Sequence, residues 1–241
     1  MRFTRGAVAA ALVAGLGGLT ALAQPGGRGM FGGFGGGPAQ LINSKIVQKE
    51  LKIDEGQASK LKEWAREFGA KQREKMRELF QGGNFDREKF GEIMAEQTKE
   101  AYKEIATVLK PDQVKRLRQI DTQVSGTRAF ATPHVQEALK LTDEQKEKVR
   151  DIEQANGKEL QELRQEFGFG RRQKGERPDP EKMAEFTKKS AAISKEAMTK
   201  LEGVLTADQK TKWKDLTGEA VDVAKIQAEA RPQFQRKKKD D

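Results

Sequence analysis

Apolar residues from position 41 onward recur every three or four positions, the spacing that places them on one face of an α-helix. In the first half of the chain these residues form three stripes: Leu61, Trp64, Phe68 and Leu79; Phe90, Ile93, Met94, Ala101, Ile105 and Val108; Val114, Leu117, Ile120 and Val124. The second half continues with Val149, Ile152, Leu160, Leu163 and Phe167, then Met183, Phe186, Ile193, Leu201 and Val204, then Trp213 and Leu216. No segment alternates convincingly with a period of two, as a half-buried strand would. The pattern predicts an all-α protein of elongated helical hairpins, in a cradle-like or bundle arrangement.

The helical region also contains an internal repeat. Residues 47–57 return 88 positions later as residues 135–145, with five of the eleven positions identical. A second matching pair, residues 108–113 and 204–209, is separated by 96 positions, so the second copy has the longer central loop. Self-similarity of this kind indicates a repeated supersecondary unit. The sequence therefore predicts two homologous helical hairpin units in tandem.

Each predicted unit contains the element Leu-Thr-x-x-Gln, or a variant of it, at helix starts. In Thr142 to Gln145 the threonine hydroxyl can accept a hydrogen bond from the backbone N–H three residues on, and the glutamine can reach back to the threonine N–H. This reciprocal pattern is a capping box, and the preceding Leu141 can pack on the first helical turn. The strict and degenerate corner positions are Ile53, Asp54 and Gln57; Leu109, Pro111 and Gln113; Leu141, Thr142 and Gln145; Leu205, Thr206 and Gln209. Four such elements at matched spacings predict that helix corners define the architecture.

The N-terminal residues have the features of a cleavable export signal. Two arginines precede an uncharged stretch, residues 6–20, and residues 21–23 supply the small-x-small pattern that signal peptidase accepts. This stretch is shorter than the roughly 20 apolar residues that a membrane-spanning helix needs. We therefore expect residues 1–23 to be a signal peptide cleaved after Ala23, with no membrane span after its removal.

Shifts in composition set the other boundaries. Residues 24–40 are dominated by glycine and are expected to form a disordered leader. The first helical unit is then residues 41–125, the second is residues 126–220, and residues 221–241 form a polar, basic tail. The chain is 34% charged and 35% hydrophobic, with a net charge of +9. In an exported protein this charge favours acidic or unfolded polypeptides as partners, and we expect no nucleic acid partner.

Catalysis is not expected. The chain has no cysteine and one histidine, so a scheme that relies on His or Cys must centre on His134. That residue follows Pro133 at a predicted helix start, where an exposed histidine of the first turn is the simpler interpretation. His134 and Glu137 share a helical face, but two ligands are too few for a zinc site. We expect no catalytic residue, no cofactor and no metal.

On these motifs the sequence resembles the Spy/CpxP family of periplasmic LTxxQ-motif proteins. The strict motifs are residues 141–145 and 205–209, and the resemblance extends over residues 41–218. It implies a periplasmic location, a role in the envelope stress response as an ATP-independent chaperone or as a restraint on a stress sensor, and a thin, curved helical dimer. Because this chain carries two units, we expect either an intramolecular pseudo-dimer or two separate hairpin domains joined at residues 121–132. A homodimer is a further arrangement.

Together these features favour a protein that holds unfolded or partly folded envelope proteins. One rival hypothesis is a regulatory protein that docks and restrains a sensor domain, and another is a structural helical spacer. The candidate client contacts are aromatic residues of the predicted hairpin loops and two nearby arginines: Phe80, Phe85, Phe167, Phe169, Arg171 and Arg172. Loops expose aromatic side chains at a solubility risk, which favours a functional role. The alternative is that these phenylalanines fold back and close the hairpin ends.

Overall fold

The computed structural model describes residues 37–81, 87–169 and 179–229, and over these residues the chain is helical, with no β-strand. Its elements are α1 (Pro38–Leu41), α2 (Lys45–Glu50), α3 (Glu55–Gln81), α4 (Arg87–Ile105), α5 (Pro111–Ser125), the 3₁₀ helix η1 (Gly126–Ala131), α6 (Pro133–Leu139), α7 (Asp143–Glu166), α8 (Pro180–Val204), α9 (Ala207–Thr217) and α10 (Val223–Glu229). The predicted all-α class is confirmed. None of the described helices combines the length and the apolar character that a membrane span requires.

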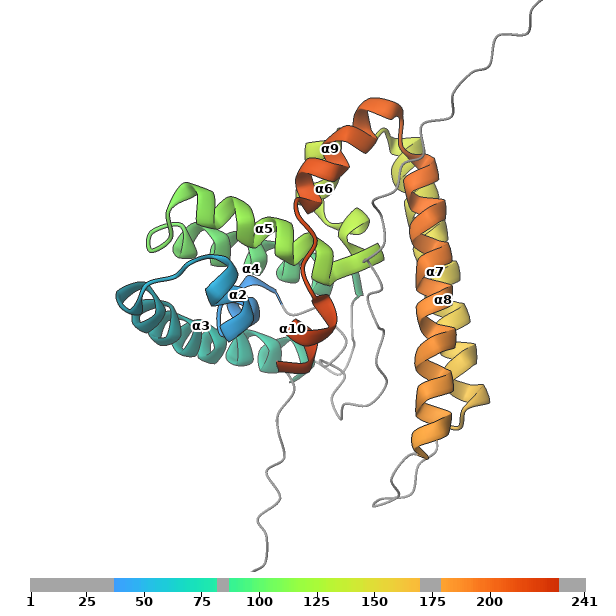
Figure 1. Cartoon of the computed structure of the whole chain (residues 1–241), viewed down its shortest axis with the longest axis horizontal. Helices are drawn as coiled ribbons and strands as arrows, with labels where there is room; N and C mark the ends of the chain where they lie inside the picture. Colours follow the sequence, from blue (N-terminus) through green and yellow to red (C-terminus); the bar gives the residue numbers. More distant parts are fainter. Residues whose placement is uncertain (1–36, 82–86, 170–178, 230–241) are drawn as a thin grey trace, which may run out of the picture.

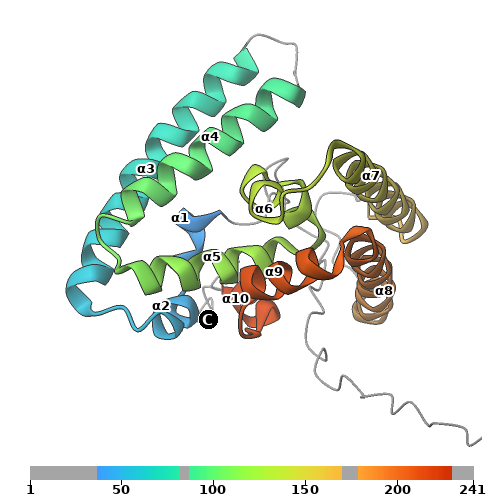
Figure 2. The same ribbon diagram turned by 90° about the horizontal axis from the view of Figure 1, so that it is seen from above.

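Two long helical hairpins project from a central group of shorter helices. Helix α3 pairs with α4 and α7 pairs with α8, and the two hairpins extend in different directions (Figures 1 and 2). Helix α5 packs against α9 between them, and α6 packs against α9 and η1. Prolines stand at the first turn of α5, α6 and α8, where a missing N–H breaks no helical hydrogen bond.

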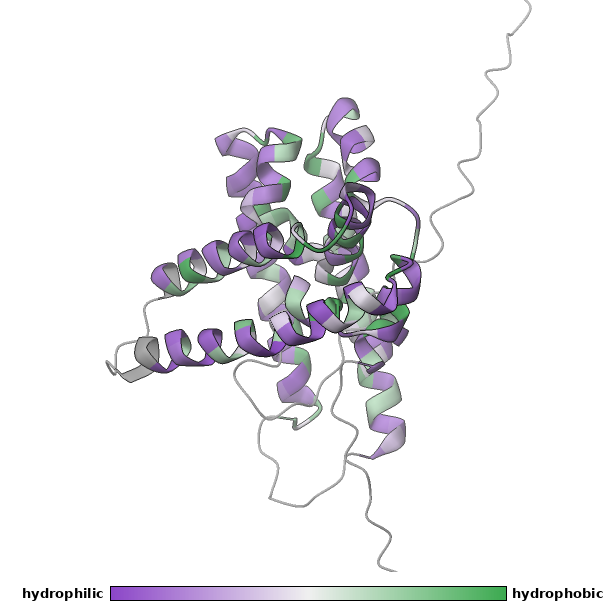
Figure 3. Ribbon diagram, turned by 90° about the vertical axis from the view of Figure 1, so that its left-hand side faces the viewer, coloured by the Kyte–Doolittle hydropathy of each residue, from purple (hydrophilic) through white to green (hydrophobic). Residues whose placement is uncertain are grey.

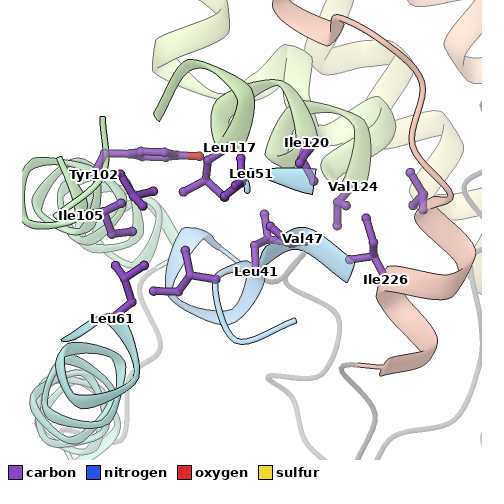
Figure 4. Close-up of a cluster of buried hydrophobic side chains, with 13 residues drawn as sticks. Leu41, Val47, Leu51, Leu61, Tyr102, Ile105, Leu117, Ile120, Val124 and Ile226 are labelled. Atoms are coloured by element: carbon purple, nitrogen blue, oxygen red, sulfur yellow. The ribbon is translucent and has the colours of Figure 1, made fainter. Parts of the chain in front are cut away.

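A first hydrophobic core joins the elements of the N-terminal half. Stripe residues predicted from the sequence, such as Leu61, Ile105 and Leu117, are no more than 1% exposed there. Figure 4 shows these side chains converging from α3, α4 and α5 onto α1 and α2. The buried members of this core are Leu41, Ile42, Val47, Leu51, Leu61, Tyr102, Ile105, Leu109, Leu117, Ile120, Val124, Val223 and Ile226.

A second core lies in the C-terminal half. Phe130 of η1 is fully buried and its ring lies 4.2 Å from that of Trp213 of α9, measured between centroids. The buried members are Ala129, Phe130, Val135, Leu139, Leu141, Val149, Leu201, Leu205 and Trp213. Hydrophilic residues predominate along the helices, and hydrophobic residues recur among them (Figure 3), as expected for a chain that packs narrow apolar stripes.

The C-terminal segment returns to the first core. Val223 and Ile226 of α10 are 4% and 2% exposed, and both belong to the core of the N-terminal half. The Glu229 carboxylate accepts a hydrogen bond from the Ser44 hydroxyl (2.5 Å) and from the Lys45 N–H (3.1 Å) at the start of α2. A carboxylate is favoured at a helix N-terminus by the unpaired N–H groups there. The prediction of a polar tail from residue 221 is therefore wrong as far as Glu229.

The boundary of the predicted leader also shifts. Pro38 and Leu41 are buried in α1, so the ordered fold begins before residue 41. A segment of four residues is too short to show a helical period. The sequence pattern therefore places this turn in the glycine-rich leader. The rest of the predicted leader and the predicted export signal lie outside the described residues.

Candidate functional site

The four predicted corners meet in two pairs. In the first corner pair, Gln57 at the start of α3 and Gln113 at the start of α5 bond reciprocally: each Nε2 donates to the Oε1 of the other, at 2.9 and 3.2 Å. The Gln57 Nε2 also donates to the backbone carbonyl of Val108 (3.0 Å), and the Gln113 Nε2 to that of Leu51 (2.9 Å). Each glutamine thus ties its own helix start to the end of another helix.

The second corner pair has the same pattern. The Gln145 Nε2 donates to the Gln209 Oε1 at 2.7 Å, and the Gln209 Nε2 donates to the Gln145 Oε1 at 2.9 Å. Their backbone acceptors are the carbonyls of Val204 (2.9 Å) and Leu139 (3.3 Å). Every partner in this pair lies 88 or 96 positions after its counterpart in the first pair, the two offsets of the sequence repeat.

The predicted capping interactions are present at these corners. The Thr142 and Thr206 hydroxyls accept from the backbone N–H of the glutamine three residues on, at 3.2 and 3.3 Å. Each glutamine Oε1 accepts in return from the N–H of its threonine, at 3.1 and 2.9 Å. The same glutamine therefore caps its own helix through Oε1 and bridges to a second helix through Nε2.

A left-handed residue precedes one corner of each corner pair, the corner at Asp54 and the corner at Thr142. Lys52 and Lys140 have φ values of 51° and 52°, a conformation that is unfavourable for residues with a Cβ. The next residue then donates its backbone N–H to a carbonyl of the preceding helix. Ile53 donates to the Gln48 carbonyl and Leu141 donates to the Gln136 carbonyl, both at 3.0 Å. This helix-ending geometry turns the chain sharply enough to present the carbonyls that the glutamines bind.

The two halves are joined along α5 and α9. The Gln119 Nε2 donates to the Asp215 carbonyl (2.9 Å), and the Gln123 Nε2 donates to the Thr217 carbonyl (2.6 Å). Gly218, which follows α9, has a φ of 61°, and a Cβ built on it would lie 2.3 Å from the Gln119 side chain. A glycine is required there because of both the backbone conformation and the close approach of α5.

A groove of about 650 Å³ opens between α5, α6 and α9. Its apolar lining consists of Ala106, Leu109, Pro111, Val114, Ala138 and Leu216. Its polar lining consists of Lys115, Arg118, Gln119, His134, Lys212 and Asp215. Volume, apolar walls and a few convergent polar groups are the features of a ligand-binding site. Helices of both halves contribute, so the site exists only when they pack together.

Arg118 is the most constrained cation of the groove. Its guanidinium lies over the Tyr102 ring, with the guanidinium carbon 3.9 Å from the ring centroid. The Tyr102 hydroxyl donates to the Asp121 carboxylate at 2.8 Å. Burial raises the pKa of Asp121 to about 6, opposed by the Tyr102 hydrogen bond and by the positive charge of Arg118. Burial raises the pKa of Tyr102 above its usual value, and the negative charge of Asp121 raises it further.

His134 lies at the mouth of the groove, in the first turn of α6. Partial burial and then the positive charge of Arg118 lower its pKa, and the negative charge of Glu137 opposes them. Among the described residues no cluster of three or more His, Asp or Glu side chains could hold a metal ion. The groove can bind an apolar group of a ligand, and its lysines and Arg118 can bind a negatively charged group of the same ligand.

The nominated loop aromatics lie elsewhere. Phe167 and Phe169 are partly buried and pack edge-on against the buried Phe186, with ring centroids 5.6 and 4.9 Å away. They fold back onto α8 at the loop end of the α7–α8 hairpin, as the alternative interpretation has it. Phe85, Arg171, Arg172 and the side chain of Phe80 are outside the described residues.

The residues of the groove were not nominated from the sequence as a binding site. Val114 and Leu216 belong to predicted core stripes, yet both are only partly buried and line the groove. Helical spacing shows that a residue lies on the apolar face but not whether another helix covers it. The cluster of Pro111, Val114, Lys115 and Arg118 on one face of α5 was the available signal.

A family model described as a domain of unknown function (DUF4890) matches residues 126–213. The matched segment begins at the first residue of η1 and ends within α9, so it corresponds to the C-terminal half of the fold. No curated protein and no solved structure matches the chain.

Proposed function

We propose that this protein is an exported, ATP-independent chaperone that holds unfolded or partly folded envelope polypeptides. The observation that carries the proposal is the groove between α5, α6 and α9, which combines apolar walls with Lys115, Arg118 and Lys212. Non-native chains expose apolar side chains that native proteins bury, and this groove offers them an apolar surface of matching size. The export signal and the resemblance to Spy/CpxP proteins support the compartment and the function.

The architecture suits reversible binding. The groove is open to solvent and lined by exposed lysines, so charge can speed the encounter while apolar contact supplies modest affinity. The corner glutamines and the α5–α9 contacts hold its walls in place without a client. A groove formed in advance costs little ordering free energy on binding.

We further propose that the two halves arose by duplication of one hairpin unit and form a pseudo-dimer within one chain. Support comes from the corner pairs, whose hydrogen bonds recur at offsets of 88 and 96 positions. The packing of α5 on α9, which occupy matching places in the two copies, supports a joint structure over two separate domains. The groove would then be a property of the duplicated form.

The second candidate function is regulatory binding of one dedicated partner. The groove has a defined shape, which also suits one sensor domain that is docked and released. A general chaperone should protect unrelated denatured proteins, whereas a sensor-specific protein should protect none of them. An inert spacer would also protect none, and it would bind no sensor domain.

The test is aggregation suppression without nucleotide. The chain from Gln24 onward is added to a chemically denatured protein that is diluted into buffer, and light scattering is followed. Near-stoichiometric suppression is expected, and Ala138→Phe, which fills the groove, should weaken it several-fold. The matched control is Ala184→Phe on the exposed surface of α8, outside the groove. No suppression at large excess, or equal activity of the two variants, would contradict chaperoning through this groove.

A further inference from the structure

We infer that Arg118 binds a carboxylate of the client, so that the groove selects segments in which an acidic residue stands close to apolar ones. This inference rests on the proposed function, because it names the class of client that the same groove accepts. It makes Arg118 the residue that determines specificity, while the apolar lining supplies contact area. The occupant is a polypeptide segment with Asp or Glu beside Leu, Val or Ile.

The first argument is that the hydrogen-bonding groups of Arg118 are unused. The guanidinium carbon lies 3.9 Å from the Tyr102 ring centroid, and within the described part of the chain no hydrogen bond or ion pair occupies its N–H groups. The side chain is only partly exposed and lines the groove. A guanidinium presents its donors in a planar fork that matches the two oxygens of a carboxylate.

The second argument is that Asp121, a carboxylate within electrostatic reach of Arg118, forms no ion pair with it. Asp121 lies one helical turn after Arg118 on α5, but it accepts its hydrogen bond from the Tyr102 hydroxyl at 2.8 Å. Tyr102 therefore contacts both residues: its ring supports Arg118 and its hydroxyl holds Asp121. The guanidinium is positioned by this contact and remains free to bind a ligand.

The third argument is the charge of the groove. Among its lining residues, the cations Lys115, Arg118 and Lys212 stand against the single carboxylate of Asp215. Helix α5 places Val114 one turn before Arg118, and α9 places Leu216 in the same lining. An acidic group and an apolar group a few residues apart on one client can therefore be bound together.

The experiment compares three labelled 12-residue peptides by fluorescence anisotropy. The first combines leucines with glutamates, the second has every glutamate replaced by glutamine, and the third keeps the glutamates but has serine in place of leucine. The proteins are the wild-type chain, Arg118→Gln, Arg118→Lys and the control Arg150→Gln, an exposed arginine of α7 outside the groove. Thermal unfolding of each variant shows whether the fold is retained.

We expect the wild type and Arg150→Gln to bind the leucine–glutamate peptide about tenfold more tightly than its glutamine analogue, as for one charge-assisted pair. Arg118→Gln should abolish this preference while still binding the apolar peptides. Arg118→Lys should keep part of it, because the charge remains and the bidentate fork is lost. If Arg118→Gln does not fold, the comparison of wild type with Arg118→Lys decides the question.

Three results would overturn the inference. Equal binding of the glutamate and glutamine peptides by the wild type, with aggregation suppression intact, would remove the carboxylate preference and leave the chaperone proposal standing. Absence of binding to any peptide, together with absence of suppression, would remove both. Binding to vesicles that contain an anionic phospholipid, lost in Arg118→Gln and without a peptide preference, would overturn the inference in favour of a lipid ligand.

Discussion

Replacing Gln209 by glutamate tests whether the corner glutamines hold the fold. The side chain is 9% exposed, and its Nε2 donates to the Leu139 carbonyl (3.3 Å) and to the Gln145 Oε1 (2.9 Å). Glutamate has the same size and keeps an acceptor for the Thr206 N–H. It loses both donated hydrogen bonds, each contributing about 1 kcal/mol, and places a charged oxygen opposite two acceptors. We expect the free energy of unfolding to fall by about 3 kcal/mol at pH 7.5.

The loss should depend on pH in a defined direction. The buried carboxylate faces oxygens, so its pKa in the folded state is raised above the unfolded value of about 4.3. The destabilisation is then complete above the folded-state pKa and shrinks as the pH falls towards the unfolded-state pKa. A neutral carboxyl can donate one hydrogen bond, so a cost of about 1 kcal/mol should remain at pH 4.

Urea denaturation followed by circular dichroism at pH 7.5 and pH 4 measures both quantities. The control is Gln154→Glu, an exposed position of α7, for which a change within about 0.5 kcal/mol is expected. If Gln209→Glu behaves like this control at pH 7.5, the corner pair does not stabilise the fold. If its loss is the same at both pH values, the substituted carboxylate does not face the acceptors described.

Three further predictions concern backbone strain and buried charge. Asp121→Asn should raise the melting temperature at pH 7.5, with a gain of about 2 kcal/mol in the free energy of unfolding that vanishes by pH 4. The wild-type Asp121 carboxyl has a raised pKa of about 6, so the wild-type protein itself becomes more stable as the pH falls. A gain that persists at pH 4 would contradict this. Lys140→Gly should stabilise by about 0.5–1 kcal/mol by relieving a φ of 52°, whereas Lys148→Gly within α7 should destabilise by about 1 kcal/mol in chemical denaturation. Gly218→Ala should destabilise the fold by about 2 kcal/mol. The control Gly157→Ala should stabilise it by up to 1 kcal/mol, because nothing lies within 4 Å of an added Cβ there. Equal effects of the two substitutions in thermal melts would show that the approach of α5 to Gly218 is not tight.

The capping motif shows how far local reasoning extends. The pairing of Thr142 with Gln145 involves residues three apart and follows from helix geometry alone, so the sequence is sufficient to predict it. The bond from Gln145 to Gln209 spans 64 positions. Nothing local distinguishes a glutamine that only caps its helix from one whose second polar atom also binds another helix, because the free Nε2 could equally face water.

The candidate site shows a different limit. The apolar spacing of α5 marks Val114 and Leu117 as members of one stripe, yet Leu117 is fully buried and Val114 lines the groove. Leu117 is covered because that face of α5 packs on the first core, whereas Val114 stays partly open beside α9. The position of α9 on α5 is set by contacts such as Gln119 to the Asp215 carbonyl. Likewise α10 has only Val223 and Ile226 as anchors, and two apolar residues in a polar segment do not predict a buried helix.

Local sequence determined the helical class, the helix starts and the repeat offsets, because helical periodicity, capping and proline placement act over a few residues. The tertiary structure alone decided the pairing of the four corners, the return of α10 to the first core and the groove whose walls include Arg118 and Leu216. These features join residues that are tens of positions apart or more. Many packings bury the same apolar stripes, so only the complete set of contacts selects one of them.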